Sequence, residues 1–151
     1  MHEDINEVAS RAEKYHLKGF NCAESVLLSV AEYFNIHCSE IPKMATPFGG
    51  GIARRGSLCG AVTGGLMALG LKFGRTTTVD VNARDRSYGK AESFLSFFEK
   101  KYGTLLCCNL IGIDLKTTEG LEQLKKIRLE KCGNYVKSAT EMVINQTESE
   151  P

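Results

Sequence analysis

The chain has 151 residues, of which 42% are hydrophobic and 25% charged, and its net charge is +1. This is the length of one ordinary domain with a buried core. The near-neutral charge argues against a nucleic-acid-binding protein, which needs a basic face to displace counterions from phosphates. The polar start predicts no signal peptide, and the longest apolar run, residues 58–71, is shorter than the roughly 20 residues of a membrane span. We therefore expect a cytoplasmic protein without a nucleic-acid partner.

Helical periodicity recurs along the chain and predicts an all-α fold of six or seven helices without a significant sheet. Asp4 is expected to cap the first helix, with Glu7 completing a capping box, and Gly19 to end it. Asn21 and Glu24 repeat the capping-box pattern at the start of the second helix. These signals give the N-terminal third of the chain two helices.

The later helices are expected from similar signals. A third begins at Ser57 and ends near Phe73, a fourth runs from Asp80 to Gly103, and a short turn covers 105–111. A fifth amphipathic segment starts at Thr117 or Thr118, and Asn134 is expected to cap the last helix. We expect one helical domain over residues 1–145 and a frayed polar tail over 146–151.

Six cysteines stand out, because in a reducing compartment cysteines are more often metal ligands, redox groups or core residues than structural disulfides. Four fall near expected helix starts, where the helix dipole and free N–H groups lower a thiol pKa and favour the reactive, metal-binding thiolate. We expect these four to gather in one site: Cys22, Cys59, Cys107 and Cys132. Cys38 is expected to be incidental, and Cys108 to be an alternative ligand.

Glycines and arginines near Cys59 extend the candidate site. Gly60 and Gly64 cost about 1 kcal/mol each relative to alanine inside a helix, so a close approach by a cofactor or by another helix is expected to compensate. Arg54 is expected to bind an anion or to balance thiolates, and its alternative is a solvated position beside Arg55. The three histidines are expected at the surface: His2, His16 and His37.

The cysteine contexts resemble one known family. The segments around residues 20–26, 48–51, 59–64, 107–112 and 132–136 are similar to those of redox-active proteins known by the pattern C_GCAxxG_C_C. Here Leu58 precedes Cys59 and Gly60 follows it, whereas the family label places glycine before the cysteine. The resemblance implies a helical fold and a redox role for the four cysteines, with Cys107 rather than Cys108 as the third.

The sequence leaves four functions open, and whether the protein is an enzyme stays open with them. Four cysteines suffice for an iron–sulfur cluster that serves electron transfer or sensing, and this is the preferred hypothesis. The same ligands could hold zinc, although their wide spacing differs from that of compact zinc fingers. Without metal they could cycle between thiols and disulfides. The remaining alternative is a helical interaction module, with a homodimer as one form of it, in which the cysteines serve only packing. A redox partner is expected but not identified.

Overall fold

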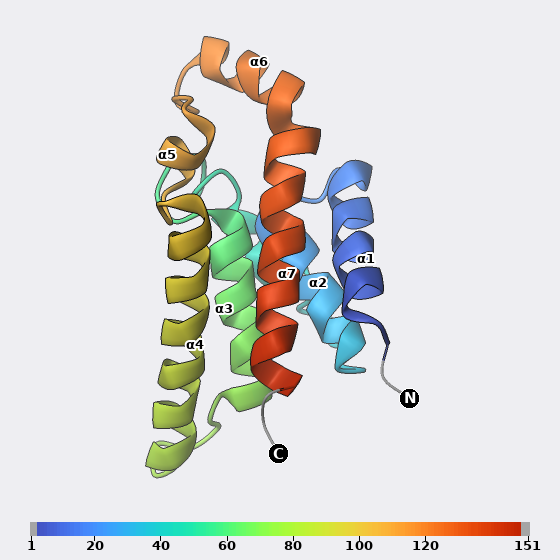
Figure 1. The fold of residues 1–151 in the computed structure, drawn as a ribbon, viewed down its shortest axis with the longest axis vertical. Helices are drawn as coiled ribbons and strands as arrows, with labels where there is room; N and C mark the ends of the chain where they lie inside the picture. The colour runs from blue at the N-terminus through green and yellow to red at the C-terminus, as the bar shows by residue number, and fades with distance from the viewer. Residues whose placement is uncertain (1–2, 149–151) are drawn as a thin grey trace.

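The structure, a computed structural model, describes residues 3–148, and its regular elements are helices (Figure 1). The expected all-α fold is confirmed, and the described residues contain no strand beyond one isolated antiparallel bridge between Leu58 and Leu106. Residues 3–148 form seven α-helices, a 3-10 helix η1 and a π-helix η2: α1 (Ile5–Lys18), α2 (Cys22–Tyr33), η1 (Lys43–Phe48), α3 (Gly60–Phe73), α4 (Val81–Tyr102), α5 (Cys107–Ile111), α6 (Thr118–Ile127), η2 (Arg128–Cys132) and α7 (Gly133–Glu148).

The long helices lie side by side in an elongated bundle, with α7 in contact with α1, α2, α3 and α4 (Figure 1). Helices α2, α3 and α7 all begin at the end of the bundle where α5 and α6 lie, and the start of α1 and the end of α7 lie at the opposite end. Because α2 and α3 both run away from that first end, the connection 34–59 has to return along the bundle. Several helix starts therefore meet at one place.

Most of the expected caps are present. Asn21 and Glu24 form a complete capping box, with the Asn21 side chain accepting from the Glu24 amide at 2.9 Å and Glu24 accepting from the Asn21 amide at 2.8 Å. Asp4 caps α1 through the amide of Asn6 at 2.8 Å instead of in the expected box with Glu7. The structure also confirms Asp80 and Thr117 as caps at helix starts and Gly19 and Gly103 as caps at helix ends.

Two expected helix starts are wrong. Ser57 does not cap α3, because its amide donates to Gly51 and its carbonyl accepts from Cys107, so the helix begins at Gly60 with Cys59 as its cap. Asn134 caps nothing, because α6 continues through η2 into α7 without a break and Asn134 lies inside α7. That helix extends to Glu148, three residues into the expected tail, and residues 149–151 lie outside the described range.

Close contact between α2 and α3 explains two of the glycines. A Cβ on Gly64 would lie 2.6 Å from the Ala23 carbonyl oxygen, and one on Gly60 would lie 3.0 Å from the Ala23 amide nitrogen. On another side of α3, a Cβ on Gly65 would meet the Phe94 ring at 2.5 Å. The expected helix-packing alternative therefore accounts for Gly64.

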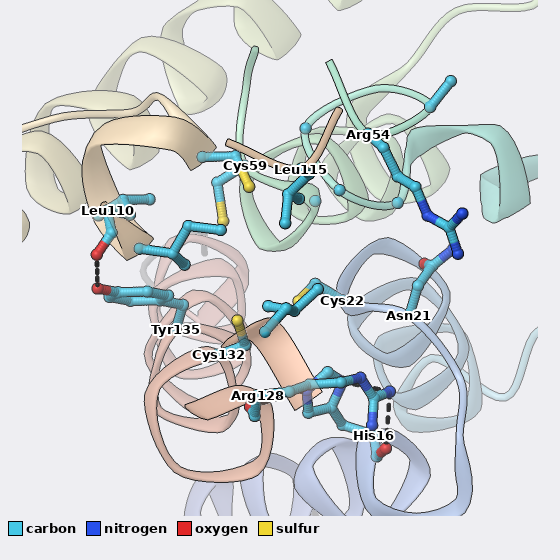
Figure 2. Close-up of a pocket in the computed structure, with 18 of the residues that line it drawn as sticks. His16, Asn21, Cys22, Arg54, Cys59, Leu110, Leu115, Arg128, Cys132 and Tyr135 are labelled. Atoms are coloured by element: carbon cyan, nitrogen blue, oxygen red, sulfur yellow. Dashed lines mark hydrogen bonds between the residues drawn. The ribbon is translucent and has the colours of Figure 1, made fainter. Parts of the chain in front are cut away.

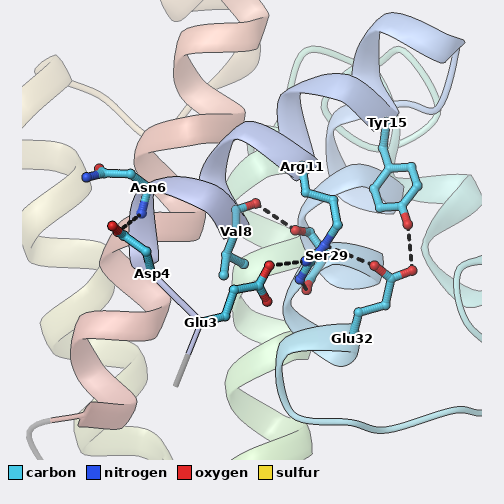
Figure 3. Close-up of polar contacts among 8 residues, drawn as sticks. All are labelled: Glu3, Asp4, Asn6, Val8, Arg11, Tyr15, Ser29 and Glu32. Carbon is cyan, nitrogen blue, oxygen red and sulfur yellow. Dashed lines mark hydrogen bonds and ion pairs between the residues drawn. The ribbon is translucent and has the colours of Figure 1, made fainter. Parts of the chain in front are cut away.

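A polar cluster fixes α1 against α2 (Figure 3). Arg11 forms ion pairs with Glu3 and, at 3.0 Å, with Glu32, and it donates to the Ser29 carbonyl at 3.1 Å. The Tyr15 hydroxyl donates to the other Glu32 oxygen at 2.5 Å. These contacts set the position of α2, whose first residue is Cys22. Within the described range, no helix is long and apolar enough to cross a membrane.

Candidate cysteine site

The four expected cysteines line one cavity of about 600 Å³ at the end of the bundle where α2 and α3 begin. Each comes from a different segment: Cys22 from the first turn of α2, Cys59 from the cap of α3, Cys107 from the start of α5 and Cys132 from the last position of η2. Figure 2 shows the labelled Cys22, Cys59 and Cys132 side chains directed into this space. The gathering predicted from sequence is therefore present as a shared cavity.

The Leu58–Leu106 bridge explains how Cys59 and Cys107 come together although they are distant in sequence. The Cys59 amide donates to the Leu105 carbonyl at 2.9 Å, and the Cys107 amide donates to the Ser57 carbonyl at 2.7 Å. These two bonds cross-link the start of α3 to the start of α5. Backbone pairing, which does not depend on side-chain type, thus sets the approach of the two cysteines.

A left-handed turn, residues 50–54, forms another wall of the cavity. All five residues have positive φ, and three of them, Ile52, Ala53 and Arg54, are not glycine. Left-handed backbone costs a non-glycine residue about 1–2 kcal/mol, and strain of this kind is typical of functional sites. Gly51 is needed here for a second reason, because a Cβ would lie 2.6 Å from the Cβ of Cys107.

Of the three other predicted site residues, two line the cavity and one does not. Gly60 and Arg54 both line the cavity, although the Arg54 side chain is also exposed to solvent. Gly64 does not line it. Cys108 is exposed, its thiol faces Asn109, and it borders a separate smaller hollow, while Cys38 is exposed elsewhere.

Sequence reasoning missed His16, which is buried at 1% exposure and lines the cavity instead of lying at the surface. Burial, followed by the nearby Arg128 charge, lowers the His16 pKa, so the ring is neutral near pH 7. Nε2 lies 3.3 Å from the Arg128 carbonyl, and Nδ1 lies 3.1 Å from the Phe20 carbonyl and 3.3 Å from the Arg128 guanidinium. The sequence does contain a pattern that predicts burial, because His16 follows the apolar residues Val8 and Ala12 at four-residue spacing on one helix face.

Arg128, also missed, joins η2 to the end of α1. Its Nη2 donates to the His16 carbonyl at 3.1 Å (Figure 2). It also donates to the Phe20 carbonyl at 2.8 Å. Phe20 lies two residues before Cys22, and Arg128 lies four residues before Cys132. The guanidinium therefore holds together the two segments that present these cysteines.

Replacing Arg128 with methionine is expected to lower the free energy of unfolding by about 2 kcal/mol, because hydrogen bonds from a charged group to two partly buried carbonyls are lost. The measurement is urea unfolding followed by circular dichroism. Lys125→Met is the matched control, since the Lys125 side chain is 73% exposed and pairs with Glu122 on its own helix. Equal losses of unfolding free energy in the two variants would contradict this role of Arg128 as a clamp between the two segments.

The four cavity thiols do not all have the lowered pKa that was expected from their places near helix starts. Burial raises the pKa of Cys59 to about 11, against the amides of Ala61 and Val62, which favour its thiolate. Burial also raises the pKa of Cys107 to about 12. The helix-start effect is present at Cys59, but loss of hydration outweighs it because the site is enclosed by protein.

Cys22 and Cys132 shift in opposite directions. The Cys22 thiol donates to the Cys132 sulfur, and this hydrogen bond raises the pKa of Cys22 and lowers that of Cys132. The charges of Arg128 and Lys131 also lower the pKa of Cys132. Figure 2 shows the two sulfurs facing one another above Arg128. Cys132 is thus the cavity thiol that ionises most readily.

In the metal-free protein, Cys132 is expected to react with iodoacetamide at lower pH than Cys59 or Cys107. Only thiolate reacts, and below its pKa the thiolate fraction of a thiol grows tenfold per pH unit, so a raised pKa delays labelling. The measurement is the extent of alkylation at each cysteine by peptide mass spectrometry after short pulses from pH 6 to pH 10. Labelling of Cys59 together with Cys132 across this range would contradict the assignment.

The cavity has a cationic character. Arg54 and Arg128 line it, and none of its described lining residues is an aspartate or glutamate. The N-termini of α2 and α3 add the positive ends of their dipoles at the same place. Within residues 3–148, no group of three or more histidine, cysteine, aspartate or glutamate side chains is arranged to hold a single metal ion. The site therefore combines four thiols with an environment that favours negative charge.

Comparison with known proteins places this arrangement in a family. The family model described as "Putative redox-active protein (C_GCAxxG_C_C)" matches residues 20–145, which include all four cavity cysteines. Searches of curated proteins and of solved structures found no match. Since the family model covers most of the chain and all of the cysteine site, the protein belongs to the C_GCAxxG_C_C family of putative redox-active proteins.

Proposed function

We propose that the protein binds an iron–sulfur cluster through Cys22, Cys59, Cys107 and Cys132 and uses it for electron transfer or redox sensing. The observation that carries this proposal is the convergence of four cysteines from four separate segments on one cavity. Cysteine thiolates are the usual ligands of both [2Fe–2S] and [4Fe–4S] clusters, and four of them complete either kind.

Charge supports this occupant. A cluster held by four thiolates is anionic, so it is favoured where cations and the N-termini of helices surround it. Arg54 and Arg128 supply the cations, and no described acidic side chain lines the cavity to oppose them. Because three of the four thiols have raised pKa values, binding would have to displace protons from Cys22, Cys59 and Cys107. Cluster loading would therefore release protons.

Ligand geometry also favours a cluster over a single zinc ion. Zinc requires four sulfurs at about 2.3 Å from one point, and no described group of three or more side chains is close enough to hold one ion. A cluster has several irons and distributes the thiolates among them, so its ligands stand farther apart. The amides of Ala61 and Val62, which favour the Cys59 thiolate, would tune the potential as hydrogen-bond donors do near cluster sulfurs.

The test is to purify the full chain without oxygen, record its visible spectrum, and measure iron, zinc and acid-labile sulfide. We expect a coloured protein with iron and sulfide in comparable amounts. A protein that stays colourless and metal-free after incubation with ferrous iron, sulfide and a thiol reductant would contradict the proposal. Stoichiometric zinc without sulfide would contradict it as well, because the four cysteines would then hold a single ion.

A further inference from the structure

The contact between Cys22 and Cys132 distinguishes these two cysteines from the other two that line the cavity. The Cys22 thiol donates to the Cys132 sulfur, whereas Cys59 influences Cys107 and Cys132 through charge alone. A disulfide needs two sulfurs that can close from contact to about 2.05 Å without moving the backbone far. In the described structure the Cys22 and Cys132 sulfurs already face one another (Figure 2).

The backbone on both sides of this pair is fixed by shared contacts. Cys22 follows the complete capping box of Asn21, and Cys132 ends a π-helix whose first residue, Arg128, is bonded to the Phe20 and His16 carbonyls. The His16 ring lies between the same two segments, with Nε2 3.3 Å from the Arg128 carbonyl and Nδ1 3.1 Å from the Phe20 carbonyl. The two cysteines are therefore held opposite each other by contacts that do not involve their sulfurs.

We infer that Cys22 and Cys132 are the pair that forms a disulfide when the cluster-free protein meets a small anionic disulfide. The cavity can admit such a molecule, since pockets of roughly 300–1,000 Å³ take drug-sized ligands and this one measures about 600 Å³. The substrate class follows from the lining, because Arg54 and Arg128 suit the carboxylates of a peptide disulfide and no described acidic residue lines the cavity. Oxidised glutathione has this chemistry.

The reaction balances in two exchange steps. The thiolate of one cysteine of the pair attacks a glutathione sulfur, which forms a mixed disulfide, breaks the glutathione S–S bond and releases one glutathione thiolate. The second cysteine loses its proton and attacks the protein sulfur of the mixed disulfide, which releases the second glutathione. Two protein thiols are oxidised to one disulfide, one glutathione disulfide is reduced to two thiols, and the two protons end on glutathione.

A consequence rests on the proposed function: the disulfide would remove two of the four proposed cluster ligands. Cys59 and Cys107 would stay as thiols in the same cavity, too few to complete a cluster. Cluster binding and the Cys22–Cys132 disulfide would then exclude each other, and a reductant would restore the binding form.

The test uses the full chain carrying Cys38→Ser and Cys108→Ser, which removes the two exposed cysteines. Trypsin then leaves one cysteine in each of the peptides 19–43, 56–72, 102–116 and 132–137. The protein is reduced, stripped of metal with a chelator and treated anaerobically with oxidised glutathione. Remaining thiols are blocked, and the linked peptides are identified by mass spectrometry. Circular dichroism of the reduced protein checks that it is folded.

We expect peptide 19–43 linked to peptide 132–137 as the main product, with Cys59 and Cys107 blocked as thiols. Adding Cys22→Ser should instead leave one glutathione on Cys132. A main link between Cys59 and Cys107, or folded protein that forms no disulfide, would overturn the inference. Iron and sulfide uptake, measured on the reduced protein, is a separate readout: uptake without the disulfide refutes this inference alone, and the disulfide without uptake refutes cluster binding alone.

Discussion

Replacing Gly64 with alanine is expected to lower the free energy of unfolding by about 3 kcal/mol, at the upper end of the usual cost of overpacking. The added Cβ would lie 2.6 Å from the carbonyl oxygen of Ala23 and 2.9 Å from its Cα. These are backbone atoms of α2, so no side chain can rotate away, and α2 and α3 would have to separate. Urea unfolding followed by circular dichroism measures the loss.

Gly70→Ala is the matched control for Gly64→Ala. Gly70 lies in the same helix, is exposed, and has nothing within 4 Å of the added Cβ. Alanine is favoured over glycine within a helix by about 1 kcal/mol, so this variant should be slightly more stable than the parent. If Gly64→Ala were as stable as Gly70→Ala, close packing of α2 on α3 would not be the reason for glycine at position 64.

Replacing Cys107 with alanine is expected to reduce bound iron and sulfide at least about tenfold, because even loss of a residue that only supports a ligand typically costs 10–100-fold in metal affinity. Cys107 is 8% exposed and lines the cavity. The measurement is iron and sulfide per chain after anaerobic reconstitution, with circular dichroism to show that the helices are intact.

Cys108→Ala provides a control one residue away. The Cys108 side chain is exposed and does not line the cavity, so iron and sulfide should stay at the parental level. Loss of iron in the Cys108 variant with retention in the Cys107 variant would reverse the assignment and make Cys108 the ligand. Equal loss in both variants would contradict the selection of one cysteine from the adjacent pair.

Local signals in the sequence predict much of the fold. Asn21, Asp80 and Thr117 cap helices because a side-chain oxygen meets nearby amides, an interaction that needs no information about the rest of the chain. Ser57 has the same chemistry but is not a cap, since its backbone pairs with residues from elsewhere, including Cys107. Asn134 fails as a cap because one helical path continues from α6 to α7.

The candidate site, like the helix starts, could be predicted from local sequence only in part. The grouping of the four cysteines could be predicted from their motif contexts, but their ionisation could not. Proximity to a helix start favours the thiolate, and this holds at Cys59, yet burial outweighs it and raises the pKa to about 11. The contact of Cys22 with Cys132 and the Arg128 clamp depend on tertiary packing, so no local pattern reports them.

The π-helix η2 has a consequence for how the protein tolerates insertions and deletions. The rotation of α7 about its axis is fixed by the core, where Val136, Ala139 and Val143 are fully buried. In an α-helix each residue turns the chain by about 100°, whereas a π-turn accommodates one extra residue. Removing one residue from η2 would let the helix become regular while α6 and α7 keep their rotation about the axis. The number of residues between Arg128 and Cys132 can therefore change without a change in the packing of α7.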